Sequence, residues 1–210
     1  MVQQNLLTAN ASFSRGAGGA AAFDQQRNAS FDDLVPRPRF DCVVRQPETH
    51  EVESLWAAAT AAVGLPIAQP CVIARVLAAD PTSIWVFENG GKLTGGFAFL
   101  FLNGAGVEAL QAGRLDTRDP PTAYLARPGE RPAGCYWWLG FRAPGPHGVG
   151  RVLEFLQTPR FETADFWMIP YTEDGRRFAR KMGFKPVESA ACRNLYRYVR
   201  ASNRSEPRDG

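Results

Sequence analysis

The hydrophobic pattern between residues 40 and 199 alternates between strand-like and helix-like segments. Short runs rich in β-branched and aromatic residues predict strands at 40–45, 84–88, 93–102, 135–141, 164–169, 184–187 and 193–199. Apolar residues at intervals of three and four predict helices at 47–63, 68–79, 107–115, 151–157 and 172–183. Strand 93–102 is apolar on both faces in its second half, which indicates a central strand covered on two sides. The order of elements predicts an α/β (α+β) three-layer domain with a mixed sheet.

The two ends of the chain lack this periodicity. Residues 1–38 are rich in Ala, Gly, Ser, Asn and Gln, and residues 201–210 are almost entirely polar. Neither segment has enough apolar material to offset the entropy of ordering it. We therefore expect a flexible N-terminal arm (1–38), one domain (39–200) and a loose C-terminal tail (201–210). A Gly/Pro-rich segment, 103–133, forms an insertion within the domain, and it is long for a connection without a function.

The charge of the chain is concentrated at its C-terminal end. Lys and Arg number 24 against 21 for Asp and Glu, and the five arginines and two acids after residue 192 account for the whole excess of +3. A domain that reads a phosphate backbone carries its basic groups across a folded face, so we expect no nucleic-acid partner. The longest apolar run, 95–102, is much shorter than the roughly 18 residues of a membrane span, and the N-terminus lacks the pattern of a secretory signal. We expect no membrane association and a cytoplasmic location.

The cysteines and histidines do not form a metal-binding pattern. The chain has four cysteines (Cys42, Cys71, Cys135 and Cys192) and two histidines, with no C-x-x-C pair and no zinc spacing. We expect no metal site, and we expect the cysteines to be reduced core residues.

Three glycines follow strand 135–141 at the start of a predicted helix. Gly145, Gly148 and Gly150 present main-chain amides where the helix begins, and a helix N-terminus adds partial positive charge. Such a segment suits a pyrophosphate, although a tight strand-to-helix turn also explains the glycines. No Gly-Lys-Ser/Thr follows, which excludes a Walker A loop. No βαβ unit of the required length surrounds the segment, which argues against a dinucleotide-binding fingerprint.

The segment GRRFARKMGFKPV, residues 175–187, resembles the closing helix and strand of the GNAT acetyltransferase superfamily. In that family a helix with paired basic residues is followed by Gly-Phe and a short strand. The order of elements from Phe40 to Val199 is also similar, and GPHGVG at 145–150 resembles the family loop Gln/Arg-x-x-Gly-x-Gly/Ala, with Gly145 where Gln or Arg is usual. The resemblance implies a mixed, mostly antiparallel sheet with helices on both faces, and acetyl-CoA or another acyl-CoA as co-substrate.

The resemblance also implies where the co-substrate lies. Its pantetheine would pair with the main chain of strand 135–141, and its pyrophosphate would lie on the amides of 145–151. The cofactor-binding candidates are Leu139, Phe141, Gly145, His147, Gly148, Val149, Gly150 and Arg151. His147 either contacts a CoA phosphate or faces solvent, and Arg151 either pairs with a phosphate or is a surface residue. The insertion 103–133 would then lie over the acceptor side as a substrate lid.

The catalytic groups depart from the family pattern. A tyrosine five positions before the Phe of Gly-Phe is the usual general acid, and Ala179 stands there. Tyr171 follows strand 164–169 where the sheet should open, so it is the catalytic candidate as a proton donor to sulfur; its alternative role is packing at the strand end. The family often has a glutamate base near its middle strands, whereas strand 135–141 carries Trp137 and Trp138. Each tryptophan is either a core residue or a wall of the acceptor cleft.

These features predict an acyl-CoA-dependent N-acyltransferase. Its reaction would move acetyl from acetyl-CoA to an amine, on a small molecule or a peptide, by direct attack on the thioester. One alternative is a catalytically inactive GNAT-fold module that binds or senses acyl-CoA, which the missing tyrosine and glutamate favour. Another is a synthase of the N-acyl amino acid or homoserine lactone type, which a wide apolar tunnel beside Trp137 or Trp138 would favour. A homodimer is compatible with each of these.

Overall fold

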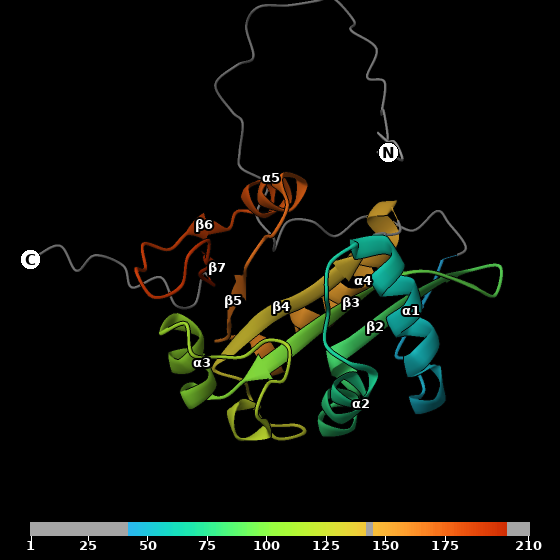
Figure 1. The fold of residues 1–210 in the computed structure, drawn as a ribbon, viewed down its shortest axis with the longest axis horizontal. Helices are drawn as coiled ribbons and strands as arrows, with labels where there is room; N and C mark the ends of the chain where they lie inside the picture. The colour runs from blue at the N-terminus through green and yellow to red at the C-terminus, as the bar shows by residue number, and fades with distance from the viewer. Residues whose placement is uncertain (1–41, 142–144, 201–210) are drawn as a thin grey trace, which may run out of the picture.

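A seven-stranded sheet forms the centre of the domain (Figure 1). The computed structural model describes residues 42–141 and 145–200, without the side chains of 145–147, so the expected arm and tail lie outside the described residues. The strands are β1 (Val43–Arg45), β2 (Ile84–Asn89), β3 (Lys92–Leu102), β4 (Gly134–Phe141), β5 (Asp165–Met168), β6 (Lys185–Pro186) and β7 (Tyr196–Tyr198). Their order is β1-β2-β3-β4-β5-β7-β6, and every neighbouring pair is antiparallel except β4 and β5.

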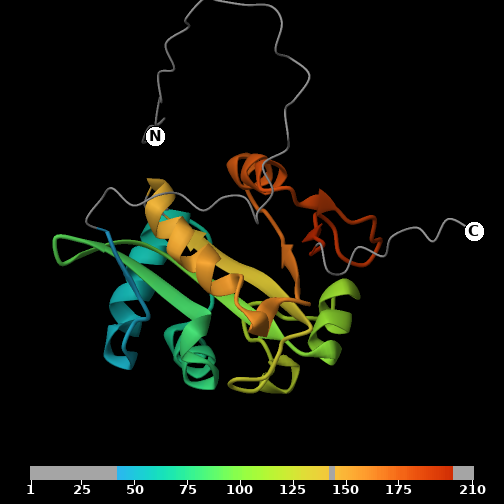
Figure 2. The ribbon, with the colours of Figure 1, turned by 180° about the vertical axis from the view of Figure 1, so that it is seen from behind.

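Helices cover the sheet on both faces, which completes the three predicted layers. They are α1 (Val52–Val63), α2 (Pro70–Ala79), α3 (Gly104–Gln111), α4 (Gly145–Leu156) and α5 (Glu173–Lys181). Short 3₁₀ turns, η2 (Thr49–Glu51), η3 (Pro81–Ser83), η4 (Thr122–Tyr124) and η5 (Pro159–Phe161), lie between them. Figure 1 shows α1 and α2 in front of the sheet, and the reverse view shows α4 lying across it (Figure 2).

The central strand β3 explains the two covered faces, because alternate residues of a strand point to opposite sides. Phe97, Phe99 and Phe101 pack on one side with Val152, Leu153 and Leu156 of α4. Ala98 packs on the other side with the buried residues of α1 and α2, and Leu100 and Leu102 pack there with those of α3. We call these sides the α4 face and the α1–α2 face. The sequence prediction of a central strand covered on two sides is confirmed.

Local capping interactions shift several helix boundaries from their predicted positions. The helix predicted from residue 47 begins at Val52, because Glu48 and Glu51 first form a capping box around η2. It ends at Gly64, whose φ of 66° gives the left-handed cap. The helix predicted at 107–115 is α3 at 104–111, because the side chain of Asn103 accepts a hydrogen bond from the amide of Gly106 at 2.9 Å.

The first strand is tied to the first helix by ion pairs. Arg45 of β1 donates to both carboxylate oxygens of Glu51, at 2.6 and 2.7 Å. It also donates to both carboxylate oxygens of Glu88 on β2, at 2.7 and 3.1 Å. These bonds hold the pKa of Glu51 down to about 2, with a hydrogen bond from the Glu48 amide as a second cause. Arg45 also lowers the pKa of Glu88.

Candidate functional site

The sheet opens between β4 and β5. The two strands pair in parallel only where Gly134–Trp137 lies beside Asp165–Met168. Beyond that point β4 continues to Phe141, while the chain after Met168 turns away to α5, so residues 138–141 keep only β3 as a strand neighbour. The β3–β4 register also shifts: Ala98 faces Leu139 and Phe99 faces Trp137, which leaves Trp138 as an extra residue. Such a bulge bends its strand locally.

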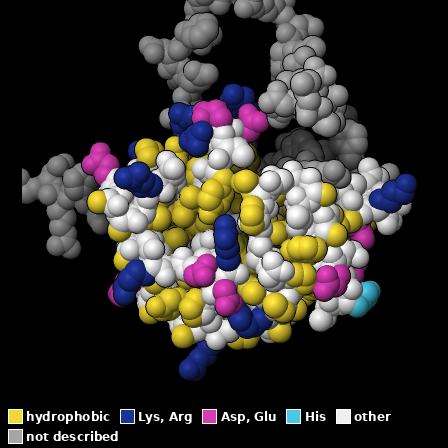
Figure 3. All heavy atoms as spheres, viewed as in Figure 1, with side chains coloured by type: hydrophobic (Ala, Val, Ile, Leu, Met, Phe, Trp, Pro, Cys, Tyr) yellow, Lys and Arg dark blue, Asp and Glu magenta, His cyan; other side chains and the backbone are white. Residues whose placement is uncertain are grey.

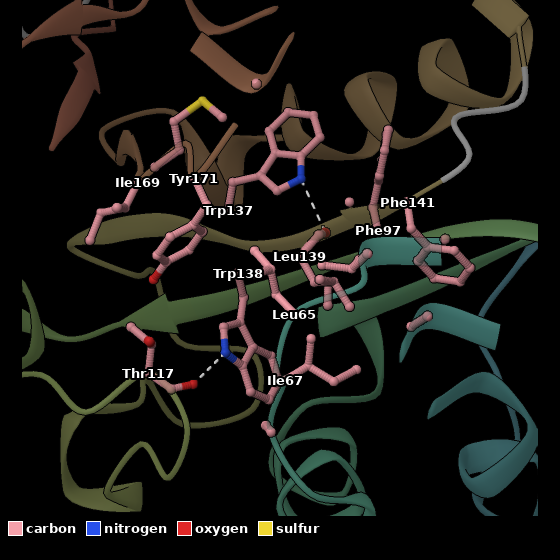
Figure 4. Close-up of a pocket in the computed structure, with 18 of the residues that line it drawn as sticks. Leu65, Ile67, Phe97, Thr117, Trp137, Trp138, Leu139, Phe141, Ile169 and Tyr171 are labelled. Atoms are coloured by element: carbon pink, nitrogen blue, oxygen red, sulfur yellow. Dashed lines mark hydrogen bonds between the residues drawn. The ribbon is translucent and has the colours of Figure 1, made fainter. Parts of the chain in front are cut away.

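A pocket of about 510 Å³ occupies this opening. Its walls come from α1, the segment between α1 and α2, the second half of β4, the segment after β5 and the start of α5. Hydrophobic side chains gather in the middle of this face of the molecule (Figure 3). Figure 4 shows the labelled lining residues Leu65, Ile67, Phe97, Thr117, Trp137, Trp138, Leu139, Phe141, Ile169 and Tyr171 around the pocket. The structure thus brings three predicted residues, Leu139, Phe141 and Tyr171, to one pocket.

Few ionisable groups line the pocket. Among the described residues these are Arg118, Asp174, Tyr136 and Tyr171. Asp174 lies in the first turn of α5, where the helix dipole stabilises its negative charge. Its carboxylate oxygen lies 3.5 Å from a guanidinium nitrogen of Arg177. No lining residue of the described chain is a glutamate. The Asp174 side chain is 90% exposed, so the described part of the pocket wall offers no buried carboxylate as a general base.

Two tyrosines stand at the pocket wall. Tyr171 is 66% exposed, so its phenol is open to a ligand. Tyr136 of β4 is buried. Burial raises the pKa of Tyr136 far above its ordinary value. The charges of Tyr171 and Cys192 and a hydrogen bond with the Tyr171 phenol raise it further. Tyr136 therefore remains a neutral phenol at physiological pH. Nothing in the sequence distinguishes it from a core residue of the predicted strand, so sequence reasoning did not select it.

The adjacent tryptophans point to opposite faces and both line the pocket. The indole of Trp137 packs on the α4 face, 4.7 Å from the Phe97 ring and 5.3 Å from the Phe178 ring of α5. Its N–H donates to the carbonyl of Leu139 at 3.1 Å (Figure 4). Trp138 lies on the α1–α2 face and donates to the carbonyl of Thr117 at 2.6 Å. Both tryptophans are at once packing residues and pocket walls.

The Trp138 bond connects the insertion 103–133 to the pocket. Thr117 and Arg118, both within the insertion, line the pocket wall. The insertion carries α3 and η4, and it is anchored where the Asn103 side chain donates to the carbonyl of Ala123 at 2.8 Å. The predicted lid segment is therefore in contact with the pocket.

The predicted phosphate loop is the first turn of a helix. α4 begins at Gly145, not at Arg151 as predicted, so Gly145, Gly148, Val149 and Gly150 are helical. The first four amides of a helix have no partner within it, which keeps them available to an anion. Gly148–Arg151 do not belong to the pocket wall, and the exposed Arg151 lies 3.7 Å from Glu154. The side chain of His147 lies outside the described residues.

Ala179, which stands where the family usually has its tyrosine, lies in the core. Ala179 is fully buried in the α4-face cluster together with Met182 and Phe184, and it does not line the pocket. Ala179 has no proton to donate, and Tyr136 and Tyr171 are the phenols among the described residues of the pocket wall.

Two further properties of the described chain bear on its chemistry. The described residues contain no group of three or more His, Cys, Asp or Glu side chains arranged to hold a metal ion. No described helix is both long and apolar enough to cross a bilayer.

Comparison with known proteins identifies the fold. No protein-family model matches the chain, and no curated protein sequence does. Among solved structures, the loading GNATL domain of CurA from Lyngbya majuscula is similar, with a TM-score of 0.55, 17% identity, and coverage of 75% of this chain and 97% of that one. Naa20 of Chaetomium thermophilum, solved with a bisubstrate analogue, has a TM-score of 0.50 and 14% identity, covering 80% and 93%. The chain therefore has the GNAT fold, which confirms the resemblance seen in the sequence.

Proposed function

We propose that the protein is an acyl-CoA-dependent N-acyltransferase. The observation that carries this proposal is the parting of β4 from β5 around a pocket, with the N-terminus of α4 only three residues beyond the end of β4. Residues 138–141 leave a strand edge without a strand partner, and such an edge suits an extended ligand that carries amides. The pantetheine of CoA is a ligand of that kind, and its pyrophosphate suits the free amides of α4.

The proposed contacts follow from these two features. The pantetheine amides pair with the main chain near Leu139 and Phe141. The Leu139 carbonyl oxygen already accepts a hydrogen bond from the Trp137 indole N–H. The second lone pair of this oxygen can accept one more hydrogen bond. The pyrophosphate lies at the main-chain N–H groups of Gly145, His147 and Gly148, since Pro146 has none. The predicted phosphate contacts Val149, Gly150 and Arg151 follow directly.

The reaction is direct attack of a neutral amine on the thioester carbon. A nitrogen–carbon bond forms, the carbon–sulfur bond breaks, and its electron pair leaves on sulfur. Solvent removes the proton of the ammonium form, since the described pocket wall has no buried carboxylate for this task. Tyr171 donates its phenolic proton to the departing thiolate and recovers one from the amine nitrogen through water. The products are an amide and free CoA.

The proposed function has two versions, which differ in the length of the acyl group that is transferred. Acetyl transfer is the simpler version. Transfer of a longer acyl chain is favoured by one observation, namely that the pocket wall beside Trp138 is apolar over Leu65, Ile67 and Leu139. The same fold could bind acyl-CoA without turnover, which the burial of Ala179 in the core favours.

Calorimetry combined with a thiol-release assay separates these versions. Acetyl-, butyryl- and octanoyl-CoA are titrated into the full chain, and free thiol is then followed with a panel of amines. We expect binding, and release that depends on the amine. Binding without release for every amine supports the non-catalytic module, and absence of binding for all three thioesters contradicts the whole proposal.

A matched pair of variants tests the phosphate position. Gly145→Asp places a carboxylate at the first residue of α4, where it stabilises the helix but repels a pyrophosphate. Gly104→Asp makes the same change at the first residue of α3, where a new side chain meets open space. We expect a CoA dissociation constant at least tenfold higher for Gly145→Asp only. Equal affinities for the two variants would show that the phosphates lie elsewhere.

A further inference from the structure

The pocket contains an apolar lobe on the α1–α2 face. We define the apolar lobe by its walls, which are Trp56, Leu65, Ile67, Trp138, Leu139 and Phe141. Leu65 is 43% exposed, one of the few large apolar side chains of the described chain left open to solvent. Figure 4 shows Leu65 and Ile67 facing Trp138 and Leu139 across this part of the pocket. Apolar surface left open inside a concavity is typical of a ligand site.

The lobe lies on the opposite side of the sheet from the proposed nucleotide site. α4, whose N-terminus would hold the pyrophosphate, packs on the α4 face with Phe99 and Phe101. The lobe is built on the other face, against α1 and the segment that follows it. A thioester at the opening between β4 and β5 would therefore meet the lobe from the side opposite CoA. This position assigns the lobe to the acceptor and not to a long acyl chain, which is the other occupant that the proposed function allows.

The charges around the lobe restrict the acceptor further. Arg118 is the one Lys or Arg among the described lining residues, and no carboxylate of the described chain forms an ion pair or hydrogen bond with its guanidinium. Asp174 lies at the start of α5 and has Arg177 as a neighbour. The six walls of the lobe carry no charge, and Arg118 lies on the pocket wall outside them, where it can meet a ligand carboxylate. Asp174, the one carboxylate among the described lining residues, is exposed beside Arg177, so the lobe offers no partner to a second ligand ammonium.

We propose that the acceptor is an α-amino acid with a large apolar side chain. This inference rests on the proposed function and names its substrate class. The apolar side chain occupies the lobe, the carboxylate meets Arg118, and the amine attacks the thioester at the opening of the sheet. Diamines and lysine side chains are poor ligands, because burying their second ammonium in the lobe leaves it unpaired.

A panel of four amines tests the class directly. L-phenylalanine, 2-phenylethylamine, L-alanine and L-lysine are compared as acceptors by thiol release with acetyl-CoA. We expect L-phenylalanine to have the highest kcat/KM. Loss of the carboxylate in 2-phenylethylamine should cost about 10- to 100-fold, as for a charged hydrogen bond. A preference for L-lysine, or equal rates for L-phenylalanine and 2-phenylethylamine, would overturn the proposal.

Arg118→Gln tests the carboxylate contact, with Arg131→Gln as its matched control. Arg131 is an exposed arginine of the same insertion and does not line the pocket. We expect Arg118→Gln to erase the preference for L-phenylalanine over 2-phenylethylamine. Arg131→Gln should retain the wild-type preference. If both variants retain it, Arg118 does not hold the carboxylate.

A binding measurement keeps this test independent of turnover. Calorimetry with L-phenylalanine is run on wild type, on Leu65→Gln in the lobe and on Val43→Gln, which changes an exposed apolar residue of β1. We expect binding that weakens several-fold in Leu65→Gln only. If L-phenylalanine binds in this way and no thioester reacts, the proposed function fails and the lobe assignment stands. If thioesters react with other amines and L-phenylalanine binds none of the three proteins, the lobe assignment alone fails.

Discussion

The two halves of β4 share a backbone but differ in their neighbours. Residues 134–137 lie between β3 and β5, and all four are buried. In residues 138–141, Trp138 is the extra residue of the bulge, and the other three pair with β3 alone. Gly140 is exposed. We call these the paired half and the open half. A strand edge has main-chain groups that need partners from outside the sheet, so the open half is the part of the strand that can take a ligand.

The comparison shows how one strand can support the core and the site together. The paired half fixes the position of the strand, since each of its residues has neighbours on both sides and on both faces. Because the open half continues the same strand, its position is fixed as well, and its backbone edge can bind a ligand without rearranging. Trp137 joins the halves, because it belongs to the paired half and its indole bonds to Leu139 of the open half. Changes in the paired half should cost stability, and changes in the open half should cost binding.

The largest effect is expected when the phenol of Tyr171, at the wall of the pocket, is removed. Tyr171→Phe should lower kcat for thiol release by about 10²- to 10⁴-fold, as for the loss of a general acid. The Tyr171 side chain is exposed, but its hydroxyl bonds to the buried phenol of Tyr136, so the free energy of unfolding should also fall by about 1 kcal/mol. Tyr136→Phe removes the equivalent hydroxyl from the paired half and should lower kcat by less than about tenfold, while stability falls by about 1 kcal/mol. A larger loss of kcat in Tyr136→Phe than in Tyr171→Phe would show that Tyr136, and not Tyr171, is the general acid.

Two glycines allow the same substitution in each half. A Cβ at Gly134, in the paired half, would lie 2.8 Å from Val107 Cγ2 and 3.0 Å from Trp167 Nε1. Gly134→Ala should therefore lower the free energy of unfolding by about 1–3 kcal/mol, as for other overpacked cores. Thermal unfolding measures this loss, and calorimetry should give an unchanged CoA dissociation constant.

Gly140→Ala is the counterpart in the open half. Its Cβ would lie 3.1 Å from the indole nitrogen of Trp137 and 3.4 Å from the Phe97 ring. This contact is looser, so the melting temperature should fall less than in Gly134→Ala. The new methyl group stands in the pocket wall, so CoA affinity should fall several-fold. If Gly134→Ala weakens CoA binding more than Gly140→Ala does, the division into two halves is wrong.

Trp137→Phe separates two roles of Trp137, namely its packing against other rings and its hydrogen bond to the open half. Phenylalanine keeps an aromatic ring against Phe97 and Phe178 but removes the N–H that donates to the Leu139 carbonyl. We expect a stability loss of about 1 kcal/mol, as for one hydrogen bond. The freed carbonyl should bind the pantetheine amide better, so the CoA dissociation constant measured by calorimetry should fall. Weaker binding would show that the indole holds the carbonyl in place for CoA.

The sequence predicted the layers of the fold because they depend on local patterns. The alternation of Phe97 to Leu102 and the helical spacing of Val52, Leu55 and Ala59 both follow from which side is buried. The start of α4 was missed because its glycines are also typical of a loop. Pro146 in the first turn was the available signal, since proline is favoured there.

The site was only partly predictable, because it depends on contacts between distant segments. Leu139, Phe141 and Tyr171 were selected from the family resemblance and do lie at the pocket. The bulge at Trp138 depends on the register with β3, which no local pattern specifies. Arg118 lies in a Gly/Pro-rich insertion whose path is set by capping and hydrogen bonds at its ends. Its position beside the pocket therefore required the structure.

The smallest effect is expected at the far edge of the sheet, which tests whether stability can change without any effect on the open half. Glu51→Gln removes one partner of Arg45, and a partly exposed ion pair contributes about 0–1 kcal/mol. The folded pKa of Glu51, about 2, lies below its ordinary value of 4.5, so the stabilisation is present above pH 4.5 and is lost as pH falls toward 2. The melting temperatures of wild type and Glu51→Gln should therefore differ most at pH 7 and by less at pH 3, where the folded-state carboxylate is still largely ionised, with equal CoA affinity at pH 7. An equal difference at both pH values would show that the side chain stabilises α1 without its charge.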